Sequence, residues 1–75
     1  DIHPEDRPAA LAAYYTACRT QTAFKAEYRA KRRDGKYRWL LANGKPQYHD
    51  DGTFKGLIGT CVDINERKMA EMRRE

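Results

Sequence analysis

The chain has 75 residues, of which 40% are hydrophobic and 35% are charged, and its formal net charge at pH 7 is +4. This length allows one domain rather than two, and it lies near the lower limit for burying a self-sufficient hydrophobic core. No apolar run approaches the roughly 20 residues that a membrane-spanning helix needs, so we expect no direct membrane contact from this segment.

The first predicted element is a helix over about residues 7–21. Asp6 is the expected N-cap, because its carboxylate can accept hydrogen bonds from the free N–H groups of the first turn. Pro8 suits that turn, where its missing N–H costs no hydrogen bond. The i, i+3, i+4, i+7 spacing of one buried stripe is followed by Leu11, Tyr14, Tyr15 and Cys18.

Alternation of apolar and charged residues then predicts two strands, over about residues 23–33 and 36–49. Between them, Asp34-Gly35 is a pair preferred in tight hairpins. We therefore expect the hairpin to have one charged face and one buried face, the latter carrying Phe24, Tyr28, Tyr37 and Trp39.

Gly44 and Pro46 interrupt the second strand, which suggests a bulge or a bend at that point. A turn at residues 50–53 leads to a third strand over about residues 53–64. This strand has apolar groups on both faces, a pattern typical of a strand covered on two sides, at Leu57, Ile58, Cys61, Val62 and Ile64.

The last predicted element is a helix over residues 65–75. Asn65 can cap it, and Arg67 and Glu71 can pair at i, i+4. A helix of this length is marginal alone, so we expect it to continue beyond this segment, pack on a partner or fray. The predicted fold class is α+β, in which residues 1–64 form a helix and a three-stranded antiparallel meander, and residues 65–75 form an exit helix.

The chain offers little that resembles catalytic or metal chemistry. Cys18 and Cys61 lie among apolar neighbours with no base nearby in the sequence, which favours two buried thiols in a reducing cytoplasm. GxSxG, HExxH and phosphate-binding motifs are missing, so we predict no catalytic residues and no enzymatic activity in this segment. His49 beside Asp50 and Asp51 suits a divalent ion, but adjacent acidic residues at a glycine turn are usually turn residues, and we predict no metal site.

Basic residues are concentrated between Lys25 and Arg38, where they alternate with aromatic residues. A nucleic-acid platform needs rings and charges on the same exposed face. The predicted separation of the rings from the charges argues against this partner, so we expect a solvated hairpin face and no nucleic acid.

Five motifs occur in order along the chain, namely His3-Pro4-Glu5-Asp6-Arg7, FKAEYR at 24–29, DGKYRW at 34–39, Asp51-Gly52, and GTCVDINERK at 59–68. Together they resemble a PAS domain of the sensory-box type, in the variety whose strands carry a PAC motif. The family's exit motif usually has Thr where this chain has Asn65, a change that keeps a helix-capping side chain.

The resemblance covers only the later part of the family's fold, because the first two strands and the short helices after them have no counterpart here. It implies a five-stranded sheet in which the last strand pairs with the first. Without that first strand, residues 54–64 would present an unpaired, apolar edge. We therefore expect a homodimer through this edge and the exit helix, or pairing of the edge with a segment outside this sequence.

The resemblance also implies a function, that of a sensory or relay module in a bacterial-type signalling protein of the histidine kinase or diguanylate cyclase class. Such a module passes its signal through the exit helix to an output domain in the same chain. The alternative is a ligand-free dimerisation or protein-interaction module.

If the module has a ligand pocket, its candidate lining is Leu11, Tyr14, Tyr15, Tyr28, Trp39, Leu41 and Ile58. Asp63 and Asn65 are the expected signal-exit hinge, because they lie where the last strand meets the exit helix. Haem is disfavoured, since the helix at residues 7–21 has no His to serve as an axial ligand. The cofactor is otherwise open, and a small molecule is compatible with the resemblance.

Overall fold

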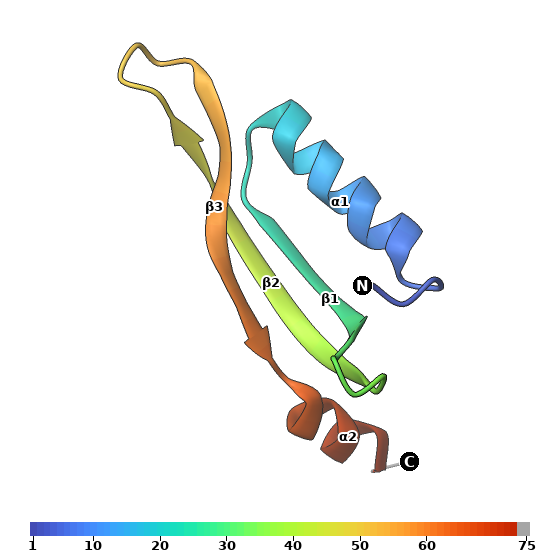
Figure 1. Cartoon of the computed structure of the whole chain (residues 1–75). Helices are drawn as coiled ribbons and strands as arrows, with labels where there is room; N and C mark the ends of the chain where they lie inside the picture. Colours follow the sequence, from blue (N-terminus) through green and yellow to red (C-terminus); the bar gives the residue numbers. More distant parts are fainter. Residues whose placement is uncertain (74–75) are drawn as a thin grey trace.

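The computed structural model describes residues 1–73, which form a three-stranded antiparallel sheet with a helix before it and a helix after it (Figure 1). The elements are α1 (Arg7–Thr20), β1 (Phe24–Lys31), β2 (Tyr37–Tyr48), β3 (Phe54–Asp63) and α2 (Asn65–Arg73). β2 is the central strand, and α1 lies alongside β1. The predicted α+β order is confirmed, and the last two residues of the predicted exit helix lie outside the described residues. Neither described helix has the length and apolar character needed to cross a membrane.

α1 begins where expected, but the carboxylate of Asp6 does not cap it. The backbone carbonyl of His3 accepts the N–H groups of Asp6 and Arg7 at 2.9 and 3.0 Å. At the other end Gln21 adopts a left-handed conformation with φ 53°, and the helix stops at Thr20. The predicted capping bond of Asp6 is therefore wrong, because its side chain is used elsewhere.

The register of the first hairpin decides which side chains share a face. Tyr28 lies opposite Leu40, and Arg29 lies opposite Trp39. Residues directly opposite in an antiparallel pair project to the same side, so Tyr28 and Trp39 are on different sides. We call the side with Tyr28 the α1 face and the other side the outer face. The predicted face of four aromatic rings is wrong, since Tyr37 and Trp39 both lie on the outer face.

A turn one residue longer than expected explains this difference. A two-residue turn at Asp34-Gly35 would pair Arg33 with Lys36. In the structure the N–H of Arg32 instead donates to the carbonyl of Lys36 at 2.9 Å, and Gly35 has φ 83°. A one-residue change in pairing moves every side chain of a strand to the opposite face.

β2 runs unbroken through Gly44 and Pro46, so the predicted bulge there is wrong. The pairing shifts later, between Gln47 and Tyr48, where Gly56 on β3 has φ 135°. Pro46 is tolerated because its nitrogen points to the β1 side of β2, past the last β1 pair, where no strand needs its N–H.

β3 is an edge strand in the described chain, and it is not covered on two faces as its composition suggested. Ile58 is 56% exposed and Val62 is 49% exposed. Cys61 is also exposed and Cys18 is half-buried, so the prediction of two buried thiols fails for Cys61. Among residues 1–73, the buried hydrophobic side chains are Ala10, Ala17 and Ile64. This core is small, so the sheet has apolar area available for further partners.

The open edge of β3 gives a first prediction. Ile64 donates its N–H to Trp39, so the alternate residues Leu57, Gly59 and Cys61 direct their N–H groups away from β2. If another copy or another segment pairs with this edge, these three amides should exchange with solvent at least tenfold more slowly than unpaired strand amides. Hydrogen exchange on the full-length protein measures this.

The outward amide of Lys25, on the opposite edge of the sheet, provides the internal reference. Native mass spectrometry of the same sample then distinguishes a dimer from pairing within one chain. Exchange of the β3 amides at the rate of Lys25, in a monomer, would contradict the expected pairing.

Candidate functional site

A partly open cavity of about 270 Å³ lies between α1 and the α1 face of the sheet. Its lining is mostly apolar and comes from the N-terminal segment, α1 and β1, namely Ile2, Ala10, Leu11, Tyr14, Phe24 and Tyr28. Ile2 is held there because it forms an isolated bridge with Ala30 beside β1. A site of this kind suits a small apolar molecule with few hydrogen-bonding groups.

The structure places the predicted pocket residues in three locations. Leu11, Tyr14 and Tyr28 line the cavity. Tyr15 is 62% exposed on the same helix and does not line it. The remaining three candidates lie on the outer face, namely Trp39, Leu41 and Ile58.

Sequence reasoning missed three residues of the cavity wall: Ile2, Ala10 and Phe24. For Phe24 the signal was present, because it alternates with Tyr28 at period two and therefore shares its face. Ala10 is one turn before Tyr14 on the same side of α1. Ile2 could not be found locally, since its position depends on a bridge to a distant strand.

Two of the residues that line the cavity, Tyr14 and Tyr28, carry a hydroxyl group. The Tyr28 hydroxyl lies 3.9 Å from Cys61 Sγ, and burial followed by this contact raises the pKa of Tyr28. A hydrogen bond with Cys18 raises the pKa of Tyr14. Both phenols therefore stay neutral at physiological pH and keep a proton that can be donated.

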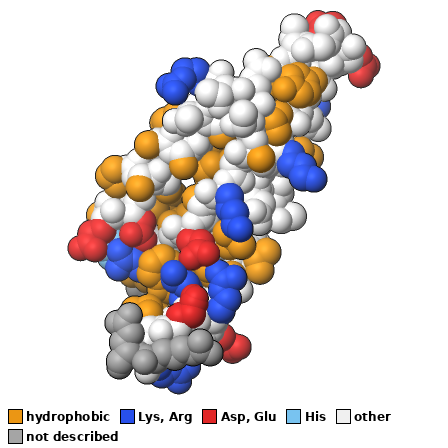
Figure 2. Space-filling model, turned by 180° about the vertical axis from the view of Figure 1, so that it is seen from behind, with side chains coloured by type: hydrophobic (Ala, Val, Ile, Leu, Met, Phe, Trp, Pro, Cys, Tyr) orange, Lys and Arg blue, Asp and Glu red, His pale blue; other side chains and the backbone are white. Residues whose placement is uncertain are grey.

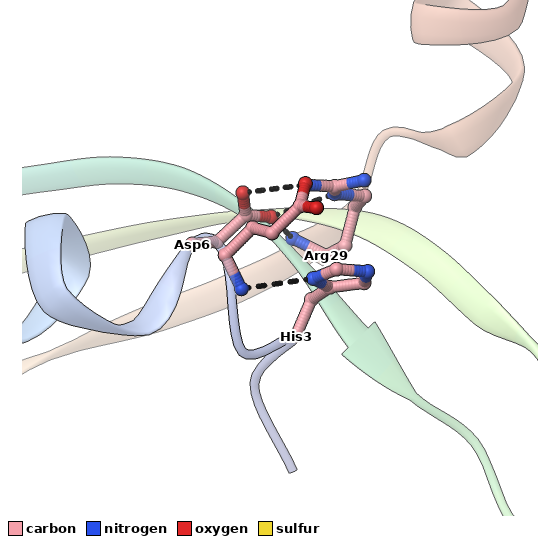
Figure 3. Close-up of polar contacts among 4 residues, drawn as sticks. His3, Asp6 and Arg29 are labelled. Atoms are coloured by element: carbon pink, nitrogen blue, oxygen red, sulfur yellow. Dashed lines mark hydrogen bonds and ion pairs between the residues drawn. The ribbon is translucent and has the colours of Figure 1, made fainter.

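A second cluster joins the start of α1 to β1 (Figure 3). Asp6 Oδ2 accepts the backbone N–H of Arg29 at 2.8 Å and its Nε at 2.8 Å, and Asp6 Oδ1 accepts Arg29 Nη2 at 2.8 Å. Glu5 adds a bond to the same guanidinium at 3.2 Å, and the Glu5 N–H donates to His3 Nδ1 at 3.1 Å. The hydrogen bonds from the Arg29 side chain hold the pKa of Asp6 at about 2, well below its usual value.

The corner between β3 and α2 is fixed by the two predicted hinge residues. Asp63 binds Arg38 Nε at 2.6 Å and accepts the backbone N–H of Asn65 at 2.9 Å. The Arg38 bond is the main reason why the pKa of Asp63 is lowered. Asn65 Oδ1 accepts the backbone N–H of Trp39 at 3.1 Å instead of capping its own helix, so the expected cap role of Asn65 is taken by Asp63.

α2 lies against the outer face through charged groups. Glu27 binds Arg67 Nη2 at 2.9 Å and Lys68 Nζ at 3.1 Å, and Lys68 Nζ lies 4.6 Å from the centre of the Trp39 ring. Arg67 therefore pairs across to β1 and not along the helix with Glu71. Figure 2 shows this side of the molecule, with acidic and basic side chains gathered at the end where α2 lies and hydrophobic ones exposed along the sheet.

The outer face also changes the argument about nucleic acid. Rings and cations do share this face, since Arg29 lies 5.4 Å from the centre of the Trp39 ring and Lys31 lies 5.7 Å from that of Tyr37. However, the Trp39 ring is covered by Arg29 and Lys68, whose charges are paired with carboxylates. A ring covered in this way offers no free surface for a base to stack on.

The second hairpin turn carries the acidic pair that sequence reasoning weighed as a metal site. Asp51 accepts the backbone N–H of Thr53 at 3.0 Å and its hydroxyl at 2.6 Å, as a turn residue does. Among residues 1–73, no three His, Cys, Asp or Glu side chains come together in a metal-binding arrangement.

A family model described as PAS fold matches residues 2–61. The uncharacterized protein y4lL of Sinorhizobium fredii is 40% identical over 73 residues, which is 97% of this chain and 9% of that protein. The chain thus spans less than a tenth of that curated relative.

Two solved structures are similar in both fold and sequence. A sensory box histidine kinase/response regulator from Burkholderia thailandensis has a TM-score of 0.83 at 30% identity, over 96% of this chain and 55% of that one. The N-terminal domain of a diguanylate cyclase with PAS/PAC sensor from Marinobacter aquaeolei has a TM-score of 0.82 at 30% identity, over 89% of this chain and 62% of that one.

The contact between Asp6 and Arg29 predicts a pH-dependent contribution to stability. Asp6→Asn should lower the free energy of unfolding at pH 7 by about 1–2 kcal/mol, because it removes the charge from a carboxylate that accepts three N–H groups. The folded pKa of about 2 lies below the usual 3.8. The contribution of Asp6 is therefore complete above about pH 5 and is lost as the pH falls from about 4 to about 2.

Urea unfolding of the full-length protein and of Asp6→Asn, measured from pH 7 to pH 2, checks this. The stability difference should shrink in the stated window. Asp50→Asn, an exposed carboxylate in the second hairpin, serves as the matched control and should change stability by less than about 0.5 kcal/mol. A difference that stays constant down to pH 2 would show that the Asp6 charge contributes nothing.

Proposed function

The chain belongs to the PAS fold family and is a sensory signalling module, and on this premise we propose that it binds a small ligand or partner and passes the signal through α2 to an output domain. The predicted membership of the family is confirmed. The narrower assignment to the variety with a PAC motif stays a prediction.

The cavity between α1 and β1 is the observation that carries the ligand part of the proposal. Its lining is mostly apolar and includes two side chains with hydroxyl groups, Tyr14 and Tyr28. A small, mainly apolar molecule with one or two hydrogen-bonding groups suits these walls. Such a ligand would contact α1 and β1 together, so its binding would favour one position of the helix over another.

The corner at Asp63 and Asn65 supports a route for the signal. Asp63 joins β2, through Arg38, to the first backbone N–H of α2. Asn65 joins the same helix to the backbone of Trp39. A change in sheet packing would therefore be transmitted to the orientation of α2 rather than absorbed in a loose linker.

The output domain is proposed to lie in the same chain, in a protein of the histidine kinase or diguanylate cyclase class. This follows from the solved relatives, which come from such proteins. Catalysis would belong to that domain and not to residues 1–75. A cytoplasmic location and a homodimer formed through β3 and α2 are part of the same proposal.

A ligand-free dimerisation module is the second candidate, because the outer face exposes apolar side chains. Ile58 and Val62 are each about half exposed on β3. Side chains of this kind on an edge strand suit pairing with another copy of the chain.

Native mass spectrometry of the full-length protein tests ligand binding. The wild type should carry an added small-molecule mass that is released under denaturing conditions. Leu11→Trp should reduce its occupancy at least tenfold, because the larger ring fills the cavity. Tyr15→Trp on the same helix is the matched control and should keep the ligand, since Tyr15 is exposed.

The outcome without an adduct is equally informative. A dimer with no added mass in the wild type would overturn ligand binding and favour the dimerisation module. Loss of the adduct in Tyr15→Trp as well would show that the ligand does not occupy this cavity.

The hinge gives a separate prediction about output. Asp63→Ala removes the bonds to Arg38 and to the Asn65 N–H, so α2 should no longer follow the sheet. The kinase or cyclase activity of the full-length protein should then become the same with and without its input signal. Asp51→Ala, which alters only the second hairpin turn, is the control, and an unchanged response in Asp63→Ala would count against the hinge.

A further inference from the structure

The attachment of α2 to the sheet depends on charge more than on apolar burial. None of the residues of α2 is buried. Its contacts with the outer face converge on Glu27, whose two carboxylate oxygens bind Arg67 at 2.9 Å and Lys68 at 3.1 Å. Contacts of this kind are individually weak at a partly exposed site, so the docked and released positions of α2 differ by little free energy.

Arg29 is the neighbour best placed to disturb this arrangement. It lies two residues from Glu27 on β1, so both side chains project from the outer face. Arg29 and Lys68 also share the Trp39 ring, at 5.4 and 4.6 Å from its centre. In the structure Arg29 binds Asp6 at 2.8 Å and Glu5 at 3.2 Å, which leaves both oxygens of Glu27 for α2.

We propose that Arg29 exchanges Asp6 for Glu27, and that this exchange releases α2 from the sheet. The side chain of Arg29 is only 29% exposed, so a guanidinium that loses its carboxylate there seeks another. Glu27 is the carboxylate next to it on the same face. Once Glu27 binds Arg29, Arg67 and Lys68 lose their common partner, and Lys68 is repelled by the cation that shares the Trp39 ring.

The exchange connects the cavity to the exit helix. Asp6 directly precedes α1, and Ala10 and Leu11 in the next turn line the cavity. A ligand that moves the first turn of α1 therefore changes the hold of Asp6 on Arg29. This last step rests on the proposed function, whereas the exchange of partners does not and can be tested without a ligand.

Hydrogen exchange of the α2 amides in the full-length protein tests the exchange of partners. Asp6→Asn should speed their exchange by about threefold to tenfold, although the hydrogen bonds of the Asp6 carboxylate go to Arg29 on β1. Glu27→Gln should have a similar effect. The double variant should exchange no faster than Glu27→Gln alone, because both changes act through the same carboxylate.

Two further variants keep the test decisive. Arg29→Gln removes the competitor, so adding Asp6→Asn to it should leave α2 exchange unchanged. Glu5→Gln removes only the 3.2 Å bond to Arg29 and should shift α2 exchange slightly in the same direction, even if Asp6→Asn is too unstable to study. The β2 amides report global unfolding in each sample, and Asp50→Asn is the surface control.

Additive effects of Asp6→Asn and Glu27→Gln on α2, beyond any change in β2, would overturn the proposal. Wild-type exchange of α2 in Asp6→Asn would overturn it too. If the exchange results are as expected but output does not respond to any input, the partner exchange stands and the sensory function fails. If output responds to input but the exchange results are not as expected, the sensory function stands and the partner exchange fails.

Discussion

The register between β1 and β2 is the constraint on which the rest of the structure depends. It places Tyr28 toward α1 and Trp39 on the opposite side, although both belong to strands with similar alternation. The cavity and the docking surface of α2 are thereby separated by the thickness of one sheet. A pairing shifted by a single residue would turn Trp39 to the α1 face. Lys68 would then lose its cation–π contact with the Trp39 ring. The turn at residues 33–35 therefore decides which side chains face the cavity and which face α2.

The Asp6 carboxylate replaces a backbone carbonyl as the hydrogen-bond acceptor for the Arg29 N–H. The segment at residues 1–3 pairs with the free side of β1, since His3 donates to Arg29 O at 2.7 Å and Lys31 donates to Asp1 O at 2.8 Å. The His3 carbonyl is committed to the first turn of α1, so the Arg29 N–H would be left without a partner. The Asp6 carboxylate supplies the missing acceptor and binds the guanidinium of the same residue. One side chain thus ends a short ladder and fixes the start of α1 to the sheet.

Local sequence patterns predicted the elements well, because helix propensity, period-two alternation and glycine turns are short-range signals. The helix at residues 7–21, the three strands and the corner between β3 and α2 are found within a residue or two of their expected positions. The failures concern pairing across the sheet or between elements. The side of Trp39 depends on one turn residue, and the partners of Asp6 and Arg67 lie on a distant strand. Three of the six residues of the cavity wall were predicted, and the patterns of α1 and β1 could also have given Ala10 and Phe24, whereas Ile2 required knowledge of the tertiary structure.

Pro46 has a consequence for how the sheet can grow. Past the start of β1, the free side of β2 offers no N–H at this position, so an additional strand cannot form a continuous ladder there. The edge of β3, by contrast, keeps its donors at Leu57, Gly59 and Cys61. Strand addition at the hairpin end of the sheet is therefore directional, because a proline obstructs one border and the other is open. This asymmetry disfavours strand addition on one side of the long hairpin and leaves the other side able to pair with a further strand.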